Sequence, residues 1–200
     1  MPPTVTAVGT RADLTTALFA EEARALGRAV GSRRREFQTG RACARHALAR
    51  VGLPATAVGG GSHGEPLWPR GVVGSITHCS GYRACAVARA RDLRAIGIDA
   101  EPHAPLPGGV LEAICGPAER RALRALPAGV CWDRLLFSAK EAVFKAWFPL
   151  SGRRLDFDDA ELLLDPHEGT FIARLAGEPG WLDGRWRVCG GIAATAVVVT

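Results

Sequence analysis

Apolar residues recur along this chain with two periods, one typical of helices and the other typical of strands. Helical spacing predicts four helices, two of them long, over residues 14–26, 31–51, 117–126 and 132–148. Alternating or short apolar runs bounded by glycine and proline predict strands over residues 72–77, 82–90, 93–99, 160–164, 170–175, 185–189 and 193–199.

A loop rich in proline and glycine, residues 102–109, separates these elements into two sets. Each set offers one long helix and a small antiparallel sheet. We therefore predict an α+β fold of two similar halves related by a pseudo-two-fold axis. The first half takes residues 1–100 and the second takes residues 101–200.

The first of two acidic clusters lies at the end of a predicted strand. Asp99 and Glu101 follow an apolar run that stops at Pro102. Because residues i and i+2 of a strand point the same way, the two carboxylates share a face. A solvated strand end would have the same composition, so this pair alone does not identify a site.

The second cluster lies on the long helix of the second half. Helical spacing places Glu141 inside a stripe of aromatic residues, with Lys145 one turn further on. An ordinary surface ion pair between these two residues is the simpler interpretation. However, a carboxylate among aromatic rings is costly unless it is paired or bound to a cation. Together with Asp99 and Glu101 it makes a set of oxygen donors that suits Mg²⁺.

Composition supports a globular chain with an unusual choice of basic residues. Of 200 residues 48% are apolar, and the net charge is +5. Of 25 basic residues 23 are Arg, and the only lysines, Lys140 and Lys145, flank Glu141. The six cysteines form no CxxC pair, and there is neither an export signal nor an apolar run of about 18 residues. We therefore expect a cytoplasmic protein without a membrane segment.

Candidate anion ligands cluster in the first half. The helix over residues 31–51 carries Arg33, Arg34 and Arg41, and its basic face also fits a solvated surface or a nucleic-acid contact. His78 follows Ser75 and Thr77 at a strand end, where it could bind a phosphate oxygen. Acidic clusters for a metal ion, fixed cations and one reactive Lys together indicate phosphoryl transfer.

Two motifs resemble those of the 4′-phosphopantetheinyl transferases. These are Gly97-Ile98-Asp99-Ala100-Glu101 and the stretch from Phe137 through Lys140-Glu141 to Lys145. Shorter elements are similar as well, in particular Gly64-Glu65-Pro66 and the segment from Gly74 to Cys79. The resemblance covers about residues 30–160 and is strongest to the actinobacterial branch of the Sfp-type class.

The resemblance implies a reaction and a set of roles. Coenzyme A would bind, with Mg²⁺ or Mn²⁺, in a cleft between the halves, and 4′-phosphopantetheine would pass to a serine of an acyl or peptidyl carrier protein, releasing 3′,5′-ADP. The first half would bind coenzyme A and the second would carry the catalytic helix. The implied metal ligands are Asp99, Glu101 and Glu141. The implied catalytic residues are Glu101, Glu141 and Lys145.

Further roles follow from the same resemblance. Lys145 would contact the pyrophosphate, and the implied coenzyme A ligands of the first half are Arg33, Arg34, Arg41, Ser75, Thr77 and His78. Trp147 and Phe148 would line the channel for the pantetheine arm. Many relatives carry a Lys in the loop that here runs from Gly59 to His63, where this chain has none.

The expected partner is an acidic carrier protein, received by the Arg120, Arg121 and Arg124 cluster. We expect a monomer that binds neither nucleic acid nor membrane. Two alternatives stay open at this point. They are a Mg²⁺-dependent nucleotide pyrophosphohydrolase, which would use the same acidic clusters, and a basic nucleic-acid-binding module.

Overall fold

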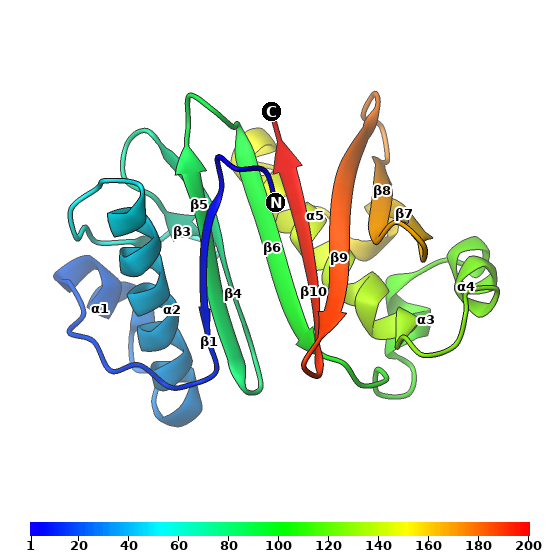
Figure 1. Ribbon diagram of the computed structural model, residues 1–200, viewed down its shortest axis with the longest axis horizontal. Helices are drawn as coiled ribbons and strands as arrows, with labels where there is room; N and C mark the ends of the chain where they lie inside the picture. Colours follow the sequence, from blue (N-terminus) through cyan, green and yellow to red (C-terminus); the bar gives the residue numbers. More distant parts are fainter. The chain divides into compact units, whose positions relative to one another are not determined.

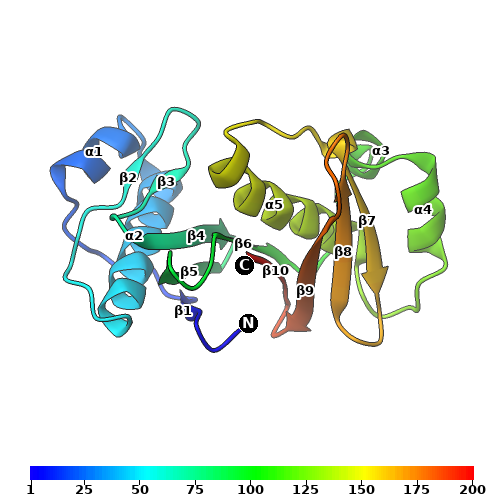
Figure 2. The same cartoon turned by 90° about the horizontal axis from the view of Figure 1, so that it is seen from above.

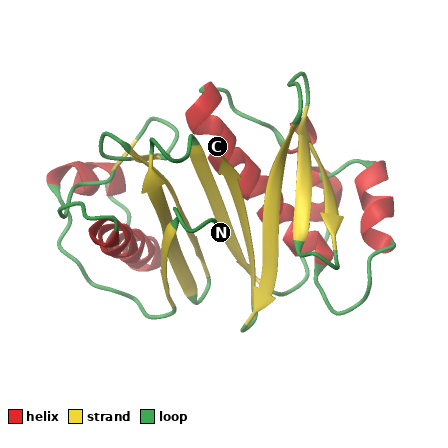
Figure 3. Ribbon diagram, turned by 45° about the horizontal axis from the view of Figure 1, so that its top comes forward, coloured by secondary structure: helices red, strands yellow, loops and turns green.

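The computed structural model describes all 200 residues and divides into two compact units. Unit 1 comprises Met1–Ile96 with Thr200, and unit 2 comprises Gly97–Val199. Both units combine helices with antiparallel strands, which Figure 3 separates by colour. The predicted α+β class, with a long helix and a small sheet in each half, is therefore confirmed.

Unit 1 is a three-stranded antiparallel sheet covered by a long helix. Its main elements are β1 (Thr6–Thr10), α1 (Ala20–Leu26), α2 (Gly31–Arg50), β4 (Val72–Cys79) and β5 (Tyr82–Arg89), with β2 (Gly59–Gly60) and β3 (Pro66–Leu67) as a short pair. The sheet order is β1-β5-β4, and α2 lies against it (Figure 1). The core between them contains Ala44, Leu48 and Val87, all fully buried.

Unit 2 contains a five-stranded sheet in the order β6-β10-β9-β8-β7. The strands are β6 (Ala95–Pro102), β7 (Ala160–Asp165), β8 (Thr170–Leu175), β9 (Trp181–Cys189) and β10 (Ile192–Val199). The helices are α3 (Val110–Ile114), α4 (Pro117–Arg124) and α5 (Trp132–Ser151), with a 3₁₀ turn, η1 (Phe157–Asp159). Figure 2 shows α5 lying against one face of this sheet.

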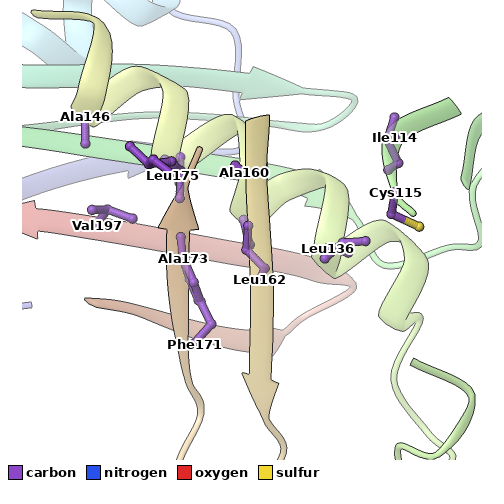
Figure 4. Close-up of a cluster of buried hydrophobic side chains, with 13 residues drawn as sticks. Ile114, Cys115, Leu136, Ala146, Ala160, Leu162, Phe171, Ala173, Leu175 and Val197 are labelled. Atoms are coloured by element: carbon purple, nitrogen blue, oxygen red, sulfur yellow. The ribbon is translucent and has the colours of Figure 1, made fainter. Parts of the chain in front are cut away.

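The core of unit 2 forms where α5 meets the sheet. The cluster combines small residues of α5, such as Ala146, with larger ones from the strands, such as Leu162 and Phe171 (Figure 4). The small side chains let the helix approach the strands closely, so the polar residues between them on α5 are held in fixed positions. This packing places the functional side chains of the helix.

The predicted helix over residues 14–26 is wrong in its first half, because α1 begins only at Ala20. The preceding segment lies on α2 instead. The Leu14 amide donates to Thr39 Oγ1 at 2.9 Å, and Gln38 Nε2 donates to the Thr16 carbonyl at 3.3 Å. Backbone groups that a helix would have used are thus bonded to side chains of α2. Sequence patterns also missed β1 and α3, which are short elements.

None of the helices combines the length and the apolar character that a membrane-spanning segment requires.

Candidate active site

Strand β6 and helix α5 approach each other at Gly97. An ideal Cβ on Gly97 would lie 1.9 Å from the Ala142 carbonyl oxygen and 2.6 Å from the Ala146 nitrogen, so only glycine fits against the helix backbone. This close approach explains the glycine that precedes Asp99 in the first motif. It also brings the second motif, on α5, beside the first.

Lys145 and Asp99 meet across this contact. Lys145 Nζ donates to Asp99 Oδ1 at 2.6 Å, and the Asp99 side chain is only 6% exposed. Lys145 therefore makes its ion pair with Asp99 on β6, and the ordinary helix-surface interpretation of Lys145 does not apply. A charged pair in such a sheltered place is a strong charge-assisted contact.

Glu141 lies within electrostatic range of both residues. Burial raises the pKa of Glu141 above the usual value for a glutamate; the Lys145 charge opposes this rise, and the Asp99 charge adds to it. A carboxylate that is disfavoured as an anion by burial and by a second carboxylate is stabilised by a bound cation.

Glu101 lies further along β6 and is held by a residue that the sequence analysis did not select. Arg134 Nη1, in the first turn of α5, donates to Glu101 Oε2 at 2.9 Å. Burial is the main cause that raises the pKa of Glu101, and the charge of Asp99 adds to it, whereas Arg134 lowers it. No spacing in the sequence links residues 101 and 134, so this contact could not be predicted from a motif.

The donor set fits a hard divalent cation in its chemistry. The charge of Asp99 contributes to the raised pKa of both Glu101 and Glu141, so each glutamate lies within electrostatic reach of Asp99. Only oxygen donors are involved, as Mg²⁺ and Mn²⁺ prefer. The three side chains do not converge as a ready-made metal cluster. Metal binding would therefore require side chains such as Asp99 to exchange a cationic partner for the ion.

Lys140, the other lysine of the second motif, is a buried structural residue. Its ammonium donates to the Ile114 and Phe157 carbonyls, both at 2.8 Å, and to Glu119 Oε2 at 3.0 Å. The other Glu119 oxygen accepts from the Leu162 amide at 2.9 Å. This buried ion pair joins α5 to α4, η1 and β7, which leaves Lys145 as the lysine available for chemistry.

A pocket of about 220 Å³ opens beside Glu141. Its lining is half apolar and half charged: Phe144, Leu155, Phe157 and Ala160 stand beside Lys140, Glu141, Arg154 and Asp156. Phe157 stacks on Phe137 at 5.8 Å between ring centroids, which fixes one wall. The lining of this pocket includes neither Trp147 nor Phe148, the two residues that the family resemblance suggested.

In unit 1, α2 and β4 bring two predicted anion ligands together. Arg33 Nη1 lies 3.1 Å from His78 Nε2, and Glu36 Oε2 lies 3.6 Å from the same nitrogen. The same imidazole nitrogen therefore faces one cationic and one anionic side chain.

Other predicted ligands of unit 1 lie apart from this pair. Arg41 is buried, donates to the Gly59 carbonyl at 3.0 Å and lies over the Phe37 ring, and burial lowers its pKa to about 10. Arg34 lines a separate pocket with Thr16 and Gln38. Ser75 and Thr77 are buried on β4, and strand alternation directs them to the face opposite that of His78.

Comparisons with known proteins decide the family. Residues 21–88 match the model of the 4′-phosphopantetheinyl transferase N-terminal domain, and residues 95–196 match that of the 4′-phosphopantetheinyl transferase superfamily. The chain belongs to the 4′-phosphopantetheinyl transferase superfamily. The predicted family and the prediction that the chain is an enzyme are therefore confirmed, and neither alternative function is favoured.

Two relatives with high sequence identity agree with this assignment. The chain is 53% identical to 4′-phosphopantetheinyl transferase Svp of Streptomyces mobaraensis over 94% of its own length and 80% of the relative. It is 48% identical to 4′-phosphopantetheinyl transferase PptT of Mycobacterium tuberculosis over 90% of this chain and 85% of the relative. Among solved structures, the holo-[acyl-carrier-protein] synthase of Thermotoga maritima is similar over 52% of this chain and 61% of that chain. The sequence identity is 24% and the TM-score is 0.41.

Proposed function

We propose that this transferase moves 4′-phosphopantetheine from coenzyme A to a serine of acyl and peptidyl carrier proteins, releasing 3′,5′-ADP. The observation that carries the proposal is the placement of Lys145 on Asp99, with Glu141 one turn earlier on α5. These residues belong to the two motifs that resemble the family. The geometry supports a site where metal and phosphate chemistry meet.

We propose that Asp99, Glu101 and Glu141 hold Mg²⁺, for which Mn²⁺ could substitute. The raised pKa values of Glu101 and Glu141, and the all-oxygen chemistry of the three side chains, support this assignment. When bound, the cation would neutralise charge on the pyrophosphate of coenzyme A. Lys145 would leave Asp99 for a phosphate oxygen and donate a proton to the departing phosphate. The free oxygen of Glu101 can either accept the serine proton or bind the ion.

The remaining parts of coenzyme A have candidate sites in each unit. Arg33 and His78 suit a phosphate group, because both can donate to an anion once the ring is protonated. Arg41 holds the Gly59 carbonyl, so it would act by supporting the loop where relatives carry a Lys. The pocket with Phe144, Leu155 and Phe157 suits the flexible pantetheine arm, since it combines an apolar wall with charged groups and includes Glu141.

The carrier protein would dock on α4. Carrier proteins are acidic, and a basic helix favours their approach. Arg121 and Arg124 are exposed there. Arg120, the third predicted residue of this cluster, is half-buried and donates to the Cys115 carbonyl at 2.9 Å. The cytoplasmic location, the monomeric state and the absence of nucleic-acid binding stay predictions.

Release of 3′,5′-ADP tests the proposed function. The protein is incubated with coenzyme A and Mg²⁺, with and without an apo carrier protein, and nucleotide products are separated by chromatography. Transfer requires that 3′,5′-ADP forms only with the carrier present. Equal release without a carrier would indicate a pyrophosphohydrolase, and the proposal would then be wrong.

A further inference from the structure

Arg134 is bonded at every nitrogen of its guanidinium. Nε donates to the Ala104 carbonyl at 3.0 Å, Nη2 to the Pro105 carbonyl at 3.0 Å, and Nη1 to Glu101 Oε2 at 2.9 Å. The side chains of Arg134 and Glu101 are only 17% and 18% exposed. A planar fork with three acceptors in fixed places cannot rotate without losing several bonds at once.

This arrangement restricts Glu101 to one available oxygen. Oε2 is taken by Arg134, so Oε1 is the atom that can turn toward a ligand. The backbone of β6 fixes one end of the side chain and Arg134 fixes the other. A carboxylate held in this way offers a single, oriented lone-pair direction, either to a cation or to a proton.

We infer that Arg134 is a positioning residue, which orients Glu101 so that Oε1 alone serves the metal ion or the serine proton. The inference rests on the proposed function of Glu101. It assigns a task to a residue outside both family motifs. Partners that orient a metal-binding carboxylate typically contribute about 10- to 100-fold to metal affinity or activity.

The positive charge of Arg134 lowers the affinity of the site for a cation, whereas the orientation that Arg134 gives to Glu101 raises it. A guanidinium beside Glu101 repels Mg²⁺, so its loss would tighten metal binding if charge were the only effect. Orientation predicts the reverse. Arg134→Lys separates the two effects, because lysine keeps the charge but cannot reproduce three bonds in fork geometry.

A neighbouring residue provides the matched control. Asp133 Oδ2 accepts from the Leu106 amide and Oδ1 from the Arg134 backbone amide, both at 2.8 Å, so Asp133 fixes the same loop and helix start without touching Glu101 or the Arg134 guanidinium. Asp133→Ala loosens the loop while leaving the Arg134–Glu101 pair in place. If Arg134 only held the loop, the two substitutions would have the same effect.

The experiment measures Mn²⁺ binding by electron paramagnetic resonance, with coenzyme A saturating, beside steady-state transfer. For Arg134→Lys we expect Mn²⁺ affinity and kcat to fall about tenfold, with KM for coenzyme A changed less than about twofold. Asp133→Ala should leave both near wild type. Mn²⁺ affinity that is unchanged or increased in Arg134→Lys would overturn the inference, as would an equal loss in Asp133→Ala.

A double-mutant cycle keeps the test decisive if one variant folds poorly. Adding Arg134→Gln to Glu101→Gln should cost little beyond Glu101→Gln alone, because a positioning residue acts only through its target. Additive losses would contradict the inference. If Glu101→Gln itself left Mn²⁺ binding and transfer intact, the proposed role of Glu101 would fail, which is a separate result.

Discussion

Lys145 Nζ and Asp99 Oδ1 lie 2.6 Å apart, joining α5 to β6 through a pair whose members have different expected ligands. Asp99 is expected to bind the metal ion, and Lys145 is expected to bind phosphate. In the absence of both ligands each residue neutralises the other. When both ligands bind, Asp99 would pair with the metal ion and Lys145 with the phosphate. The Lys145–Asp99 ion pair therefore holds both side chains in place before the ligands arrive.

Lys145→Met should therefore separate metal binding by Asp99 from the phosphate chemistry of Lys145. We expect kcat to fall about 100-fold or more, the size of a lost general acid, while Mn²⁺ still binds because Asp99 is intact. Lys145→Arg serves as the control, since it keeps the charge but is a poor proton donor. Rapid-quench transfer kinetics measure the effect. Full activity of Lys145→Met would remove Lys145 from the chemistry.

Glu141→Gln should stabilise the metal-free protein at neutral pH. Because burial raises the pKa of Glu141 in the fold, the folded state holds its proton to higher pH than the unfolded chain. Stability is therefore lost as pH rises from the ordinary glutamate pKa through the raised one. A neutral amide avoids this loss, so the gap in Tm between variant and wild type should widen with pH.

Thermal unfolding in a metal chelator between about pH 4.5 and 7.5 measures this gap. Added Mg²⁺ with coenzyme A should raise the Tm of the wild type and reverse the order of the two proteins. If the variant is less stable than wild type at neutral pH without metal, the destabilising burial of Glu141 is refuted.

The buried Lys140–Glu119 pair predicts a loss of stability rather than a specific loss of chemistry. Lys140→Met leaves Glu119 buried without its cation, which typically costs about 3–5 kcal/mol of unfolding free energy. Replacing both residues, with Glu119→Gln added, should recover part of this cost. Urea unfolding measures the free energies. A Lys140→Met protein of normal stability but no activity would instead assign Lys140 to catalysis.

Charge reversal on α4 tests the carrier surface. Arg121→Glu with Arg124→Glu should raise KM for the carrier protein strongly while KM for coenzyme A stays constant. Arg185→Glu with Arg187→Glu is the matched control, because these exposed residues of β9 change the net charge equally. Equal effects of the two pairs, or equal effects on both substrates, would argue against docking on α4.

The sequence predicted the long elements well because their patterns are local. The 3.6-residue spacing in α2 and α5 and the alternation in β8 reflect which face is buried, and the apolar run of β5 reflects a strand that is buried on both faces. The helix expected from Leu14 failed because long-range bonds from Thr39 and Gln38 hold that segment. No local pattern encodes such a contact.

In the candidate site, too, local patterns could be predicted from the sequence and long-range contacts could not. Asp99, Glu101 and Glu141 could be selected because acidic residues at buried positions conflict with the local pattern. Arg134 could not be selected from the sequence. Its contact with Glu101 forms only because the fold places the start of α5 beside the end of β6. The family resemblance selected Lys145 over Lys140, and the packing supplies the physical difference, because Lys140 is bonded in the interior whereas Lys145 pairs with Asp99.

Intact mass of an apo carrier protein tests the central claim most directly. The carrier is incubated with the enzyme, coenzyme A and Mg²⁺, in parallel with Glu141→Gln and with a chelator. We predict a gain of one phosphopantetheine group with the wild type, and none with the variant or without metal. An unchanged mass across several carriers would contradict the transfer, and a gain that persists with Glu141→Gln would contradict the metal site.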